Sequence, residues 1–569
     1  MADFYLGIDL GTTNTVAALG IKRRSGEEFY PEVIRIPQYD SNNALTEMRY
    51  LPSVLYVDHN GQRIVGKRAK DMRFYQSGRT IANSKRYIGQ SYRWEIDGQV
   101  ITPCDVAAEI LKRCRRAAEE YTRKEIKGAV ITVPASFNND QIYDTIRAAE
   151  IAGFNKDEIV ILPEPTASLI YFVNKESVKE ESIIDFSAPR RIMVFDIGGG
   201  TCDIAVVEVS RKGLSLTFRE LAVGRYEELG GIDFDFWAAD YLFHCFIREH
   251  KINPEHLTDE EKEEMFNKLV VFAEEAKESI SSQVMMNYLD GREEKDENII
   301  FQRTVPEFYQ KRPYEFVISK KEYDQATERL YQRRSEKVRT EREARERKNI
   351  IDPVYETLSA YRLTPEDIDF IYMTGGMSRY QKLQKRLEKE FGKGIFVADS
   401  PTESVANGAA IYHYYNVVQE RLRTEIMRDN SKQIKKDDLK EISYDIINVL
   451  AEAIMIDVEN GLPEVIIPAQ TPVPYEGKLE KRLKTTSPSG IKINLYGGQD
   501  AFDPQMRIQK SYVAKFSYPV ESGTAIDVEY KIDKNKILSI TMKVKDNPPI
   551  ELTIERDLPV EERRLDYAW

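Results

Sequence analysis

Two segments of the chain combine residue types that could hold a phosphate group. Gly7 to Thr15 reads Gly-Ile-Asp-Leu-Gly-Thr-Thr-Asn-Thr, and Val194 to Ile204 reads Val-Phe-Asp-Ile-Gly-Gly-Gly-Thr-Cys-Asp-Ile. In each, an apolar strand leads through Asp into a Gly/Thr turn, and a second apolar strand follows. Because glycine lets successive backbone N–H groups point toward one anion, we expect two paired phosphate-binding turns. The residues predicted to contact phosphate are Gly11, Thr12, Thr13, Asn14, Gly198, Gly199, Gly200 and Thr201.

A carboxylate stands at the end of the first strand in each segment. Asp9 and Asp196 would repel a phosphate, so we expect them to hold Mg²⁺ through its waters and thereby neutralise that phosphate. The segments are not Walker loops, because no Gly-Lys-Ser or Gly-Lys-Thr follows. They are not dinucleotide fingerprints either, because a strand rather than a helix follows each turn. A strand–turn–strand phosphate clamp used twice is typical of the actin-like ATPase architecture.

Composition excludes several other classes of protein. A length of 569 residues requires several domains, and 41% hydrophobic with 31% charged residues is typical of folded globular chains. The net charge of −12 argues against nucleic-acid binding, which needs clustered Lys and Arg. The four cysteines lack zinc-ligand spacing, no segment has the ~20 apolar residues of a membrane span, and the acidic N-terminus is unlike a signal peptide. We expect a cytoplasmic protein that binds neither nucleic acid nor membrane.

The elements that must position these residues change in character along the chain. Up to about residue 415, strand-like and helix-like runs alternate, which predicts an α/β domain. Beyond residue 450 apolar residues recur with a period of two, which predicts an antiparallel β-sandwich. The expected organisation is a duplicated, ribonuclease-H-like (actin-like) α/β ATPase domain at 1–415, a charged insertion and linker at 416–450, a β-sandwich at 451–557 and a short tail at 558–569.

Four further motifs accompany the two turns. They are Ile131-Thr-Val-Pro-Ala-Ser-Phe-Asn138, Glu164-Pro-Thr-Ala167, Leu229-Gly-Gly-Ile-Asp-Phe-Asp235 and Thr374-Gly-Gly-Met-Ser-Arg379. In this order the motifs closely resemble those of the DnaK-type seventy-kilodalton heat-shock chaperones, over the first seven-tenths of the chain. The β-rich remainder resembles that family's peptide-binding domain more weakly. The resemblance implies an ATPase that hydrolyses ATP to ADP and phosphate, and a chaperone that binds extended apolar peptide.

The resemblance assigns roles at the phosphate end of the expected site. Thr12 and Thr201 would face the terminal phosphate. Glu164, held in the Pro163-Glu-Pro165 frame, would orient or deprotonate the attacking water. Lys85, in a segment similar to the family's Lys-Arg-Leu-Ile-Gly, would stabilise the charge that grows on that phosphate. The residues expected to act in hydrolysis are thus Lys85, Glu164, Thr201, Asp196 and Asp9, with Asp203 helping to order the waters around Mg²⁺ and an accompanying K⁺.

The resemblance also places the nucleoside. Glu274 and Lys277 match positions that hydrogen-bond the ribose, and Arg379 lies in a loop that flanks the base, where a guanidinium can stack on a purine. Gly230 and Gly231 match a turn that lets a helical lobe approach the phosphates. The full set expected to hold the nucleotide beyond the two turns is Gly230, Gly231, Glu274, Lys277, Ser281, Gly375, Gly376, Ser378 and Arg379.

For the β-sandwich, the resemblance implies a channel for one extended client peptide, with Ile491 and Ile493 near it. A J-domain co-chaperone and a nucleotide-exchange factor are the implied partners. Family members continue into a helical lid, which we expect to be absent because only a short tail follows Arg556. Peptide binding should then be weak and quickly reversible.

Two departures concern the coupling of the domains. Ile142 stands where the family has an Arg thought to relay nucleotide state, and Asp445 to Leu450 only loosely echoes the family's Leu-rich linker. We therefore expect ATP hydrolysis to be intact and ATP-controlled peptide release to be reduced. Two alternatives remain open at this point. One is a nucleotide-gated scaffold with a single dedicated partner, and the other is a small-molecule kinase on the same fold.

Overall fold

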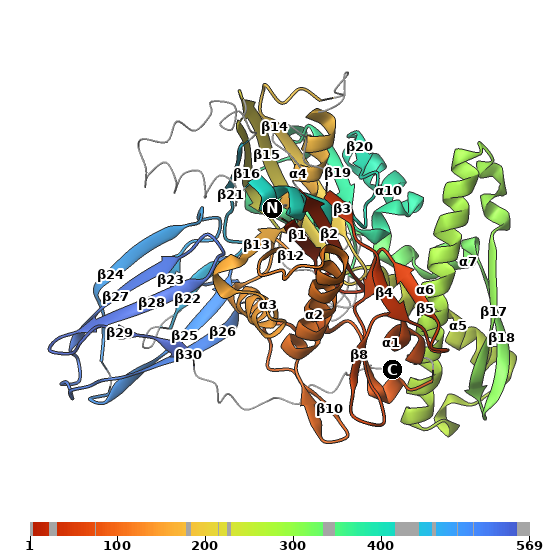
Figure 1. Ribbon diagram of the computed structural model, residues 1–569, viewed down its shortest axis with the longest axis horizontal. Coiled ribbons are helices and arrows are strands. Elements are labelled where there is room, and N and C mark those ends of the chain that lie inside the picture. The colour runs from red at the N-terminus through yellow and green to blue at the C-terminus, as the bar shows by residue number, and fades with distance from the viewer. Residues whose placement is uncertain are drawn as a thin grey trace.

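The computed structural model describes residues 4–21, 31–73, 75–177, 184–213, 215–224, 229–333, 348–415, 443–457, 463–485, 487–503 and 506–554. These residues form a two-lobed α/β domain with a β-sandwich beside it, next to α3 (Figure 1).

The first lobe is built on a sheet with the strand order β13-β12-β1-β2-β3. β1 is antiparallel to β2 and parallel to β12, and β12 is parallel to β13. Leu6 and Ile8 of β1 pack with α2 and α3 on one face, while Tyr5 packs on the other face. Both faces are therefore covered, as parallel pairing requires. The bounds are β1 (Phe4–Asp9), β2 (Asn14–Ile21), β3 (Pro31–Val33), β12 (Ala129–Val133), β13 (Ile159–Pro163), α2 (Pro103–Thr122) and α3 (Asn139–Ile151).

The second lobe repeats this arrangement. Its sheet runs β20-β19-β14-β15-β16, with β14 antiparallel to β15 and parallel to β19, and β19 parallel to β20. Order and directions match the first sheet strand for strand, so the two lobes are duplicates of one fold. A sixth strand, β21, joins the edge strand β16 in parallel. The bounds are β14 (Arg190–Ile197), β15 (Cys202–Lys212), β16 (Ser215–Val223), β19 (Phe370–Thr374), β20 (Ile395–Val397) and β21 (Ser443–Ile447).

Two helices, α4 (Glu164–Ser177) and a helix over residues 404–415, join the lobes, because their apolar side chains share one core with both sheets. Glycine makes the close packing possible. A Cβ on Gly408 would lie 1.7 Å from the carbonyl oxygen of Ala167, and a Cβ on Gly7 would lie 2.3 Å from the backbone nitrogen of Ala410. Any larger residue at these two positions would push the helices and the first sheet apart.

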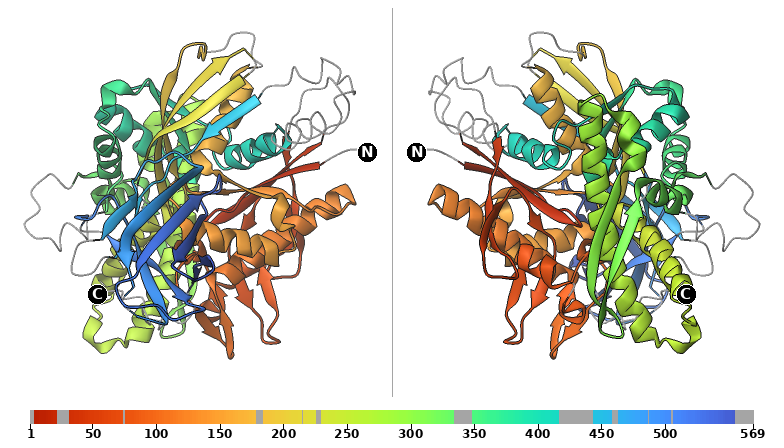
Figure 2. Two further views of the ribbon diagram at one scale, coloured as in Figure 1. Left: turned by 90° about the vertical axis from the view of Figure 1, so that its left-hand side faces the viewer. Right: turned by 90° about the vertical axis from the view of Figure 1, so that its right-hand side faces the viewer.

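Each lobe carries further elements beyond its sheet. In the second lobe, α5, α6 and the β17–β18 hairpin form an outer part, seen on the right of Figure 1 and in both views of Figure 2. The bounds in the first lobe are β4 (Ile36–Tyr39), β5 (Leu45–Met48), β6 (Leu51–Pro52), β7 (Leu55–Val57), β8 (Arg63–Val65), α1 (Lys67–Met72), β9 (Thr80–Ile81), β10 (Trp94–Ile96) and β11 (Gln99–Ile101). Those in the second are α5 (Gly231–Glu249), α6 (Asp259–Leu289), β17 (Ile300–Tyr309), β18 (Arg312–Ser319), α7 (Lys320–Ala326), α9 (Asp352–Ala360) and α10 (Gln381–Phe391).

The C-terminal domain is a β-sandwich. One sheet runs β23-β22-β25-β26-β30 and the other β24-β27-β28-β29, and alternate apolar residues of both form one core. The bounds are β22 (Ala453–Ile456), β23 (Glu464–Ile467), β24 (Tyr475–Lys484), β25 (Gly490–Gly498), β26 (Arg507–Lys515), β27 (Ala525–Ile532), β28 (Leu538–Val544), β29 (Ile550–Glu551) and β30 (Thr553–Ile554). The predicted fold class, a duplicated α/β ATPase domain followed by an all-β sandwich, is confirmed.

Some of the predicted segments lie outside the described residues. These are most of the charged insertion, at 416–442, and everything after residue 554, including the predicted tail and the expectation of a missing lid. Within the described part of the chain, no helix combines the length and the apolar character of a membrane span.

The strand β21 binds the second lobe by more than backbone pairing. Tyr444 is buried, its ring stacks on Phe218 with centroids 6.0 Å apart, and it lies 4.9 Å from the ring of Tyr415. The amide of Asn174 donates to the Tyr444 hydroxyl at 3.2 Å. The segment that leads to the β-sandwich is thus part of the two-lobed domain's own sheet.

Replacing Tyr444 with Ala should destabilise the two-lobed domain by roughly 3 kcal/mol, because a buried aromatic ring is lost and a cavity remains. Tyr444→Phe should cost about 1 kcal/mol, since it removes only the hydroxyl that accepts from Asn174. The midpoint of urea unfolding measures both effects. Tyr39→Ala is the control, because Tyr39 is 56% exposed. Equal midpoints for Tyr444→Ala and Tyr39→Ala would show that β21 does not stabilise the sheet.

Candidate active site

The two glycine-containing turns face each other where the lobes meet. The first joins β1 to β2 and the second joins β14 to β15. A Cβ on Gly199 would lie 1.7 Å from Thr13 Oγ1, and a Cβ on Gly200 would lie 2.4 Å from Thr12 Cγ2. The turns are thus in direct contact across the interface, which only glycine permits. They line one end of a cleft of about 440 Å³ between the lobes.

Most residues predicted to act in hydrolysis or to hold the nucleotide line this cleft. They are Asp9, Gly11, Thr12, Thr13, Asn14, Lys85, Glu164, Asp196, Gly198, Gly199, Thr201, Gly231, Glu274, Lys277, Ser281, Gly375, Gly376 and Arg379. Four do not. Gly200 and Gly230 pack against each other, Ser378 donates to the carbonyl oxygen of Gly375 at 2.7 Å, and Asp203 accepts a 2.5 Å hydrogen bond from Ser136. These four support the lining from behind.

Three buried carboxylates, those of Glu164, Asp196 and Asp203, and the half-buried carboxylate of Asp9 gather at the turns. Burial, and next the charge of Glu164, raise the pKa of Asp9 and the pKa of Asp203 from 3.8 to about 7. Burial, Glu164 and the other two aspartates also raise the pKa of Asp196 well above its ordinary value. Like charges so close together in a low dielectric cannot all ionise without a compensating cation. The site is therefore built to receive positive charge.

Lys85 supplies part of that charge. Its ammonium donates to Glu164 Oε1 at 2.6 Å, and both side chains are buried. Burial alone would lower the pKa of Lys85, but Glu164 and Asp9 raise it, so the lysine is charged. Glu164 opens α4, directly after β13, and Lys85 lies in a short helical turn of the first lobe. The sequence-predicted lysine and glutamate are thus brought together in the cleft.

The residues present fit a nucleotide with Mg²⁺. Three buried oxygens near the turns, Thr13 Oγ1, Asn14 Oδ1 and Asp203 Oδ2, have no hydrogen-bond partner among the described residues. Buried oxygens without partners are costly, and a phosphate with its hydrated cation would satisfy them. Within the described chain, no three His, Cys, Asp or Glu side chains converge as direct metal ligands. A cation held through water by Asp9 and Asp196 needs no such convergence.

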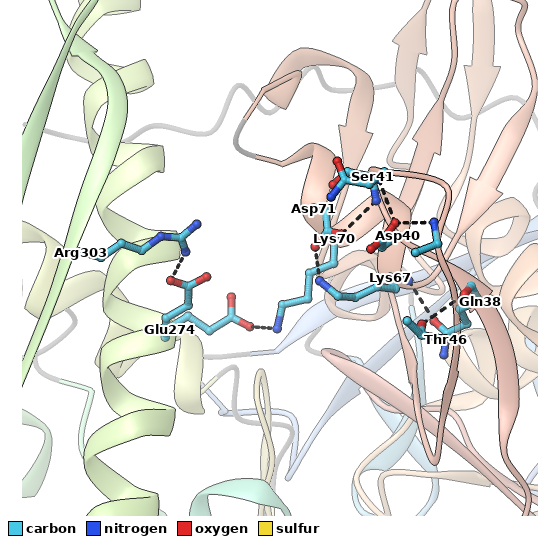
Figure 3. A network of polar contacts seen from close by, with 12 residues as sticks. Gln38, Asp40, Ser41, Thr46, Lys67, Lys70, Asp71, Glu274 and Arg303 are labelled. Atoms are coloured by element: carbon cyan, nitrogen blue, oxygen red, sulfur yellow. Dashed lines mark hydrogen bonds and ion pairs between the residues drawn. The ribbon is translucent and has the colours of Figure 1, made fainter.

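At the other end of the cleft, an ion-pair bridge joins the lobes. Lys70 and Arg73, from and beside α1 of the first lobe, donate to the two oxygens of Glu274 on α6 at 2.8 and 2.9 Å. Figure 3 shows Lys70 reaching across to Glu274. Burial would raise the pKa of Glu274, but Arg73 and Lys70 lower it to about 2. The predicted ribose-binding glutamate thus also closes the cleft.

The other predicted nucleoside residues belong to the second lobe. Lys277 donates to Asp235 Oδ2 at 2.7 Å and to the carbonyl oxygen of Gly231 at 2.9 Å. Gly375 has a φ of +83°, and a Cβ there would lie 2.5 Å from Asp196 Oδ1. This left-handed conformation turns the loop that carries Arg379 toward the cleft.

Sequence reasoning missed several residues of the cleft. Tyr50, Lys70, Arg73 and Asp235 also line it. A fifth missed residue, Arg86, supports the second turn by donating to the carbonyl oxygen of Gly200 at 2.9 Å. Tyr50, Lys70 and Arg73 lie outside every motif and reach the cleft only through the fold of the first lobe. Arg86 directly follows Lys85, and Asp235 ends one of the quoted motifs, so their charge beside these motifs was the available signal.

The predicted peptide residues lie on one face of β25. Ile493 is buried in the sandwich core, whereas Ile491, two residues earlier, is only partly buried against that core. Between them Lys492 is exposed. Ile142, the apolar departure, is buried in the core of the first lobe, and Ile537 of the sandwich packs against that core.

These features define a class of protein. Two duplicated lobes, with glycine turns that meet over buried carboxylates and a lysine, form a nucleotide-binding domain of the actin-like ATPase fold. A β-sandwich follows it in the chain. The comparisons with known proteins then identify the family.

A family model described as Hsp70 protein matches residues 5–99, 92–304 and 344–563. Similar proteins include the Chaperone protein DnaK of Thermosipho africanus, which is 29% identical over 549 residues, or 95% of this chain and 78% of that protein. The Chaperone protein DnaK of Thermosipho melanesiensis is 28% identical over 549 residues, and that of Thermotoga maritima is 28% identical over 545 residues, with the same coverage of both chains.

The chain belongs to the Hsp70 family. It is an ATPase and an ATP-dependent chaperone of the Hsp70 type, and a divergent one, because its identity to these relatives is below 30%. The comparisons favour neither the small-molecule kinase nor the dedicated scaffold considered from the sequence.

Replacing Lys85 with Met should slow ATP hydrolysis by about 100-fold or more, because the variant loses the cation that we expect beside the reacting phosphate. ATP should still bind, since the turns and the nucleoside end are unchanged. Single-turnover hydrolysis and nucleotide titration separate the two effects. Lys156→Met is the control, since its side chain is 76% exposed. Hydrolysis at the control's rate in Lys85→Met would remove this residue from the site.

The nucleotide-free protein should lose stability as the pH rises. Burial and Glu164 raise the folded-state pKa of Asp203 to about 7, so the stability that its protonated form contributes is complete below 3.8 and is lost as the pH rises through about 7. The urea midpoint, measured without nucleotide or Mg²⁺, should therefore be lower at about pH 8 than at about pH 5.5. The Asp203→Asn variant should show a smaller difference between the two pH values. Asp290→Asn, at an exposed position, is the control and should leave the difference as large as in the parent. An unchanged fall in Asp203→Asn would contradict the assignment.

Proposed function

We propose that ATP hydrolysis between the two lobes controls the affinity of the β-sandwich for extended apolar peptide. One observation carries the proposal. The glycine turns of both lobes meet beside a buried Lys85–Glu164 ion pair and three aspartates, two of them buried, while the same domain incorporates the linker strand of the sandwich. A phosphate-binding centre and a peptide-binding domain are thus parts of one packed structure.

In this proposal the backbone amides of the two turns hold the phosphates of ATP, and the hydroxyls of Thr12 and Thr201 face the terminal phosphate. Lys85 stabilises the charge that develops there as the bond to the leaving oxygen breaks. Glu164 holds the attacking water and accepts its proton, and its ion pair with Lys85 fixes its orientation.

Asp9 and Asp196 would hold Mg²⁺ through water, with Asp203 and K⁺ completing the ordered shell. When bound, Mg²⁺ would neutralise phosphate charge and reduce the electrostatic repulsion among the carboxylates. The partnerless oxygens of Thr13, Asn14 and Asp203 support this assignment.

The nucleoside would lie along α6 of the second lobe. Glu274, Lys277 and Ser281 would contact the ribose, and Arg379 would stack on the base. Because Glu274 is also bound by Lys70 and Arg73 of the first lobe, release of the nucleotide would require this bridge to open.

For the sandwich, we propose that Ile491 lies at the channel for an extended client peptide, which binds by main-chain pairing and apolar pockets. Ile493, which is buried in the core, would shape the channel from beneath. A J-domain co-chaperone and a nucleotide-exchange factor are the proposed partners, and the cytoplasm is the proposed location. ATP is expected to accelerate peptide release less than in a fully coupled chaperone, because Ile142 replaces a charged relay residue.

The test measures peptide binding and release on one strand of the sandwich. Ile491→Asp should weaken the binding of a fluorescent apolar peptide at least tenfold, since a carboxylate would enter an apolar pocket. Lys492→Asp is the matched control, because Lys492 is the next residue and is exposed. Peptide off-rates with ADP and with ATP then report the coupling.

Retained melting of Ile491→Asp is required, so that lost binding reports the channel and not unfolding. Equal peptide affinity in the two variants would remove Ile491 from the channel. No measurable peptide binding in the parent protein would contradict the proposed function, whereas off-rates that ATP leaves unchanged would contradict only the coupling.

A further inference from the structure

An aromatic side chain of the first lobe stands in the cleft and is not used by the proposed mechanism. Two aromatic side chains of the described chain line the cleft, Tyr50 and Tyr380. Tyr380 is only 4% exposed, and its hydroxyl donates to Asp324 Oδ1 at 2.8 Å, so it belongs to the wall of the second lobe. Tyr50 is 38% exposed although it lies in the cleft. Part of this residue is therefore left for a ligand to cover.

The charges around Tyr50 show which end of the cleft it occupies. Burial raises the pKa of its hydroxyl, Lys70 lowers that pKa, and Glu278 and Glu274 raise it. Lys70 and Glu274 form the ion-pair bridge between the lobes, and Glu278 lies one helical turn further along α6. Tyr50 thus lies beside the bridge and near α6, which is where the proposed function places the nucleoside.

The backbone at Tyr50 is tied to a loop that also lines the cleft. The preceding residue, Arg49, donates from Nε and Nη2 to the two carboxylate oxygens of Glu403 at 2.6 and 2.9 Å. Pro401 and Thr402, which directly precede Glu403, line the cleft. The double hydrogen bond of Arg49 therefore holds Tyr50 at the cleft wall.

A buried amide joins Tyr50 to the helix that carries Lys70. Gln38 is 4% exposed, its Nε2 donates to the carbonyl oxygen of Tyr50 at 2.7 Å, and its Oε1 accepts from the backbone N–H of Lys67 at 2.9 Å. Lys67 is the first residue of α1. Figure 3 shows Gln38 beside Lys67, and Lys70 reaching toward Glu274 from the same helix. Tyr50 and the first-lobe side of the bridge are thus held in a fixed relation.

We propose that Tyr50 is a nucleoside-binding residue, whose ring packs from the first lobe against the adenosine that α6 and the Arg379 loop hold from the second lobe. A tyrosine ring is a large, rigid apolar surface, and it packs well on the faces of a purine and its ribose. The inference rests on the proposed function, since it concerns the nucleotide of that same site. It adds a first-lobe contact to a nucleoside site whose other proposed members all belong to the second lobe.

The rival explanation is that Tyr50 only supports the bridge and does not touch the nucleotide. Two comparisons separate the explanations. Tyr50→Phe keeps the ring and removes the hydroxyl that lies near the charges of the bridge. Lys70→Ala combined with Arg73→Ala removes the cations of the bridge, so an effect of Tyr50 that remains in this background does not pass through the bridge.

Tyr50→Ala should weaken the binding of ADP with Mg²⁺ by about tenfold, as is typical when an aromatic ring that packs on a nucleobase is removed. Titration calorimetry measures this affinity. Tyr50→Phe should bind ADP within about twofold of the parent, because it keeps the ring. Tyr39→Ala is the matched control, because Tyr39 is a tyrosine of the same lobe, on β4, and is 56% exposed. Unchanged ADP affinity in Tyr50→Ala, or an equal loss in Tyr50→Phe, would overturn the proposal.

Steady-state hydrolysis gives an independent readout. In Tyr50→Ala, KM for ATP should rise by about tenfold while kcat stays within about twofold of the parent, because a nucleoside contact is present equally in the ground state and the transition state. Partial unfolding would lower kcat and leave KM unchanged, so it does not imitate this result. A lower kcat at the parent's KM would contradict the assignment.

The last measurement tests for a path through the bridge. In the Lys70→Ala and Arg73→Ala background, Tyr50→Ala should weaken ADP binding by the same factor as in the parent, because contacts that act independently add. Loss of the Tyr50→Ala effect in that background would overturn the proposal. A parent protein that does not bind ADP would contradict the proposed function itself, whereas a parent that binds ADP no more tightly than Tyr50→Ala would contradict only this inference.

Discussion

The electrostatic repulsion among buried carboxylates is the constraint on which the rest of this structure depends. Asp9, Asp196, Asp203 and Glu164 lie where two lobes meet, and Lys85 is the lysine paired with them. Burial disfavours every one of these charges, and the carboxylates disfavour each other. The cluster therefore needs cationic ligands to reach its fully ionised form, and it needs a rigid scaffold that keeps the groups together when those ligands are absent.

Duplication supplies that scaffold. Each lobe presents one strand end with an aspartate and one glycine turn. Gly408 lets the two central helices pack closely against each other, and Gly7 lets the first sheet pack closely against one of them. The lobes then diverge. The second lobe adds α5 and α6, which contribute residues to the cleft, and it accepts β21 as a sixth strand. Because no strand of the described residues pairs beyond β3 in the first sheet, the symmetry of the duplicated fold is broken on the side where the second domain attaches.

The sequence predicted those parts of the site whose signal is local. Gly-Thr-Thr and Gly-Gly-Gly-Thr between apolar strands identified both turns. The glycines that give each turn its conformational freedom and the apolar residues that form the strands are neighbours in the sequence. Lys85 and Glu164 have no such local signal and were found only through the resemblance to a family. Tyr50, Lys70 and Arg73 were missed, because their roles arise from the folding of the first lobe toward α6. The alternation of apolar residues in β25 predicted that Ile491 and Ile493 lie on one face of the strand. It did not predict that Ile493 is buried while Ile491 is only partly buried.

The joint between the two domains shows why a tertiary arrangement can be more specific than any motif. There the ammonium of Lys536, in the turn between β27 and β28, lies 3.9 Å from Glu220 Oε2, on β16 of the second lobe. Such a pair is not an efficient source of stability when both groups are buried, and an apolar pair of the same shape would serve better. What the charged pair adds is selectivity for one arrangement. Glu220 is compensated only when the linker N–H of Val449 and the sandwich turn are both in place. If the linker or the sandwich were displaced, the buried carboxylate of Glu220 would lose its partners and would carry its full desolvation cost, or water would enter the joint. The carboxylate cluster in the cleft and the single carboxylate at the joint thus follow the same rule, since each is tolerable only in the presence of a cation that a different part of the assembly provides.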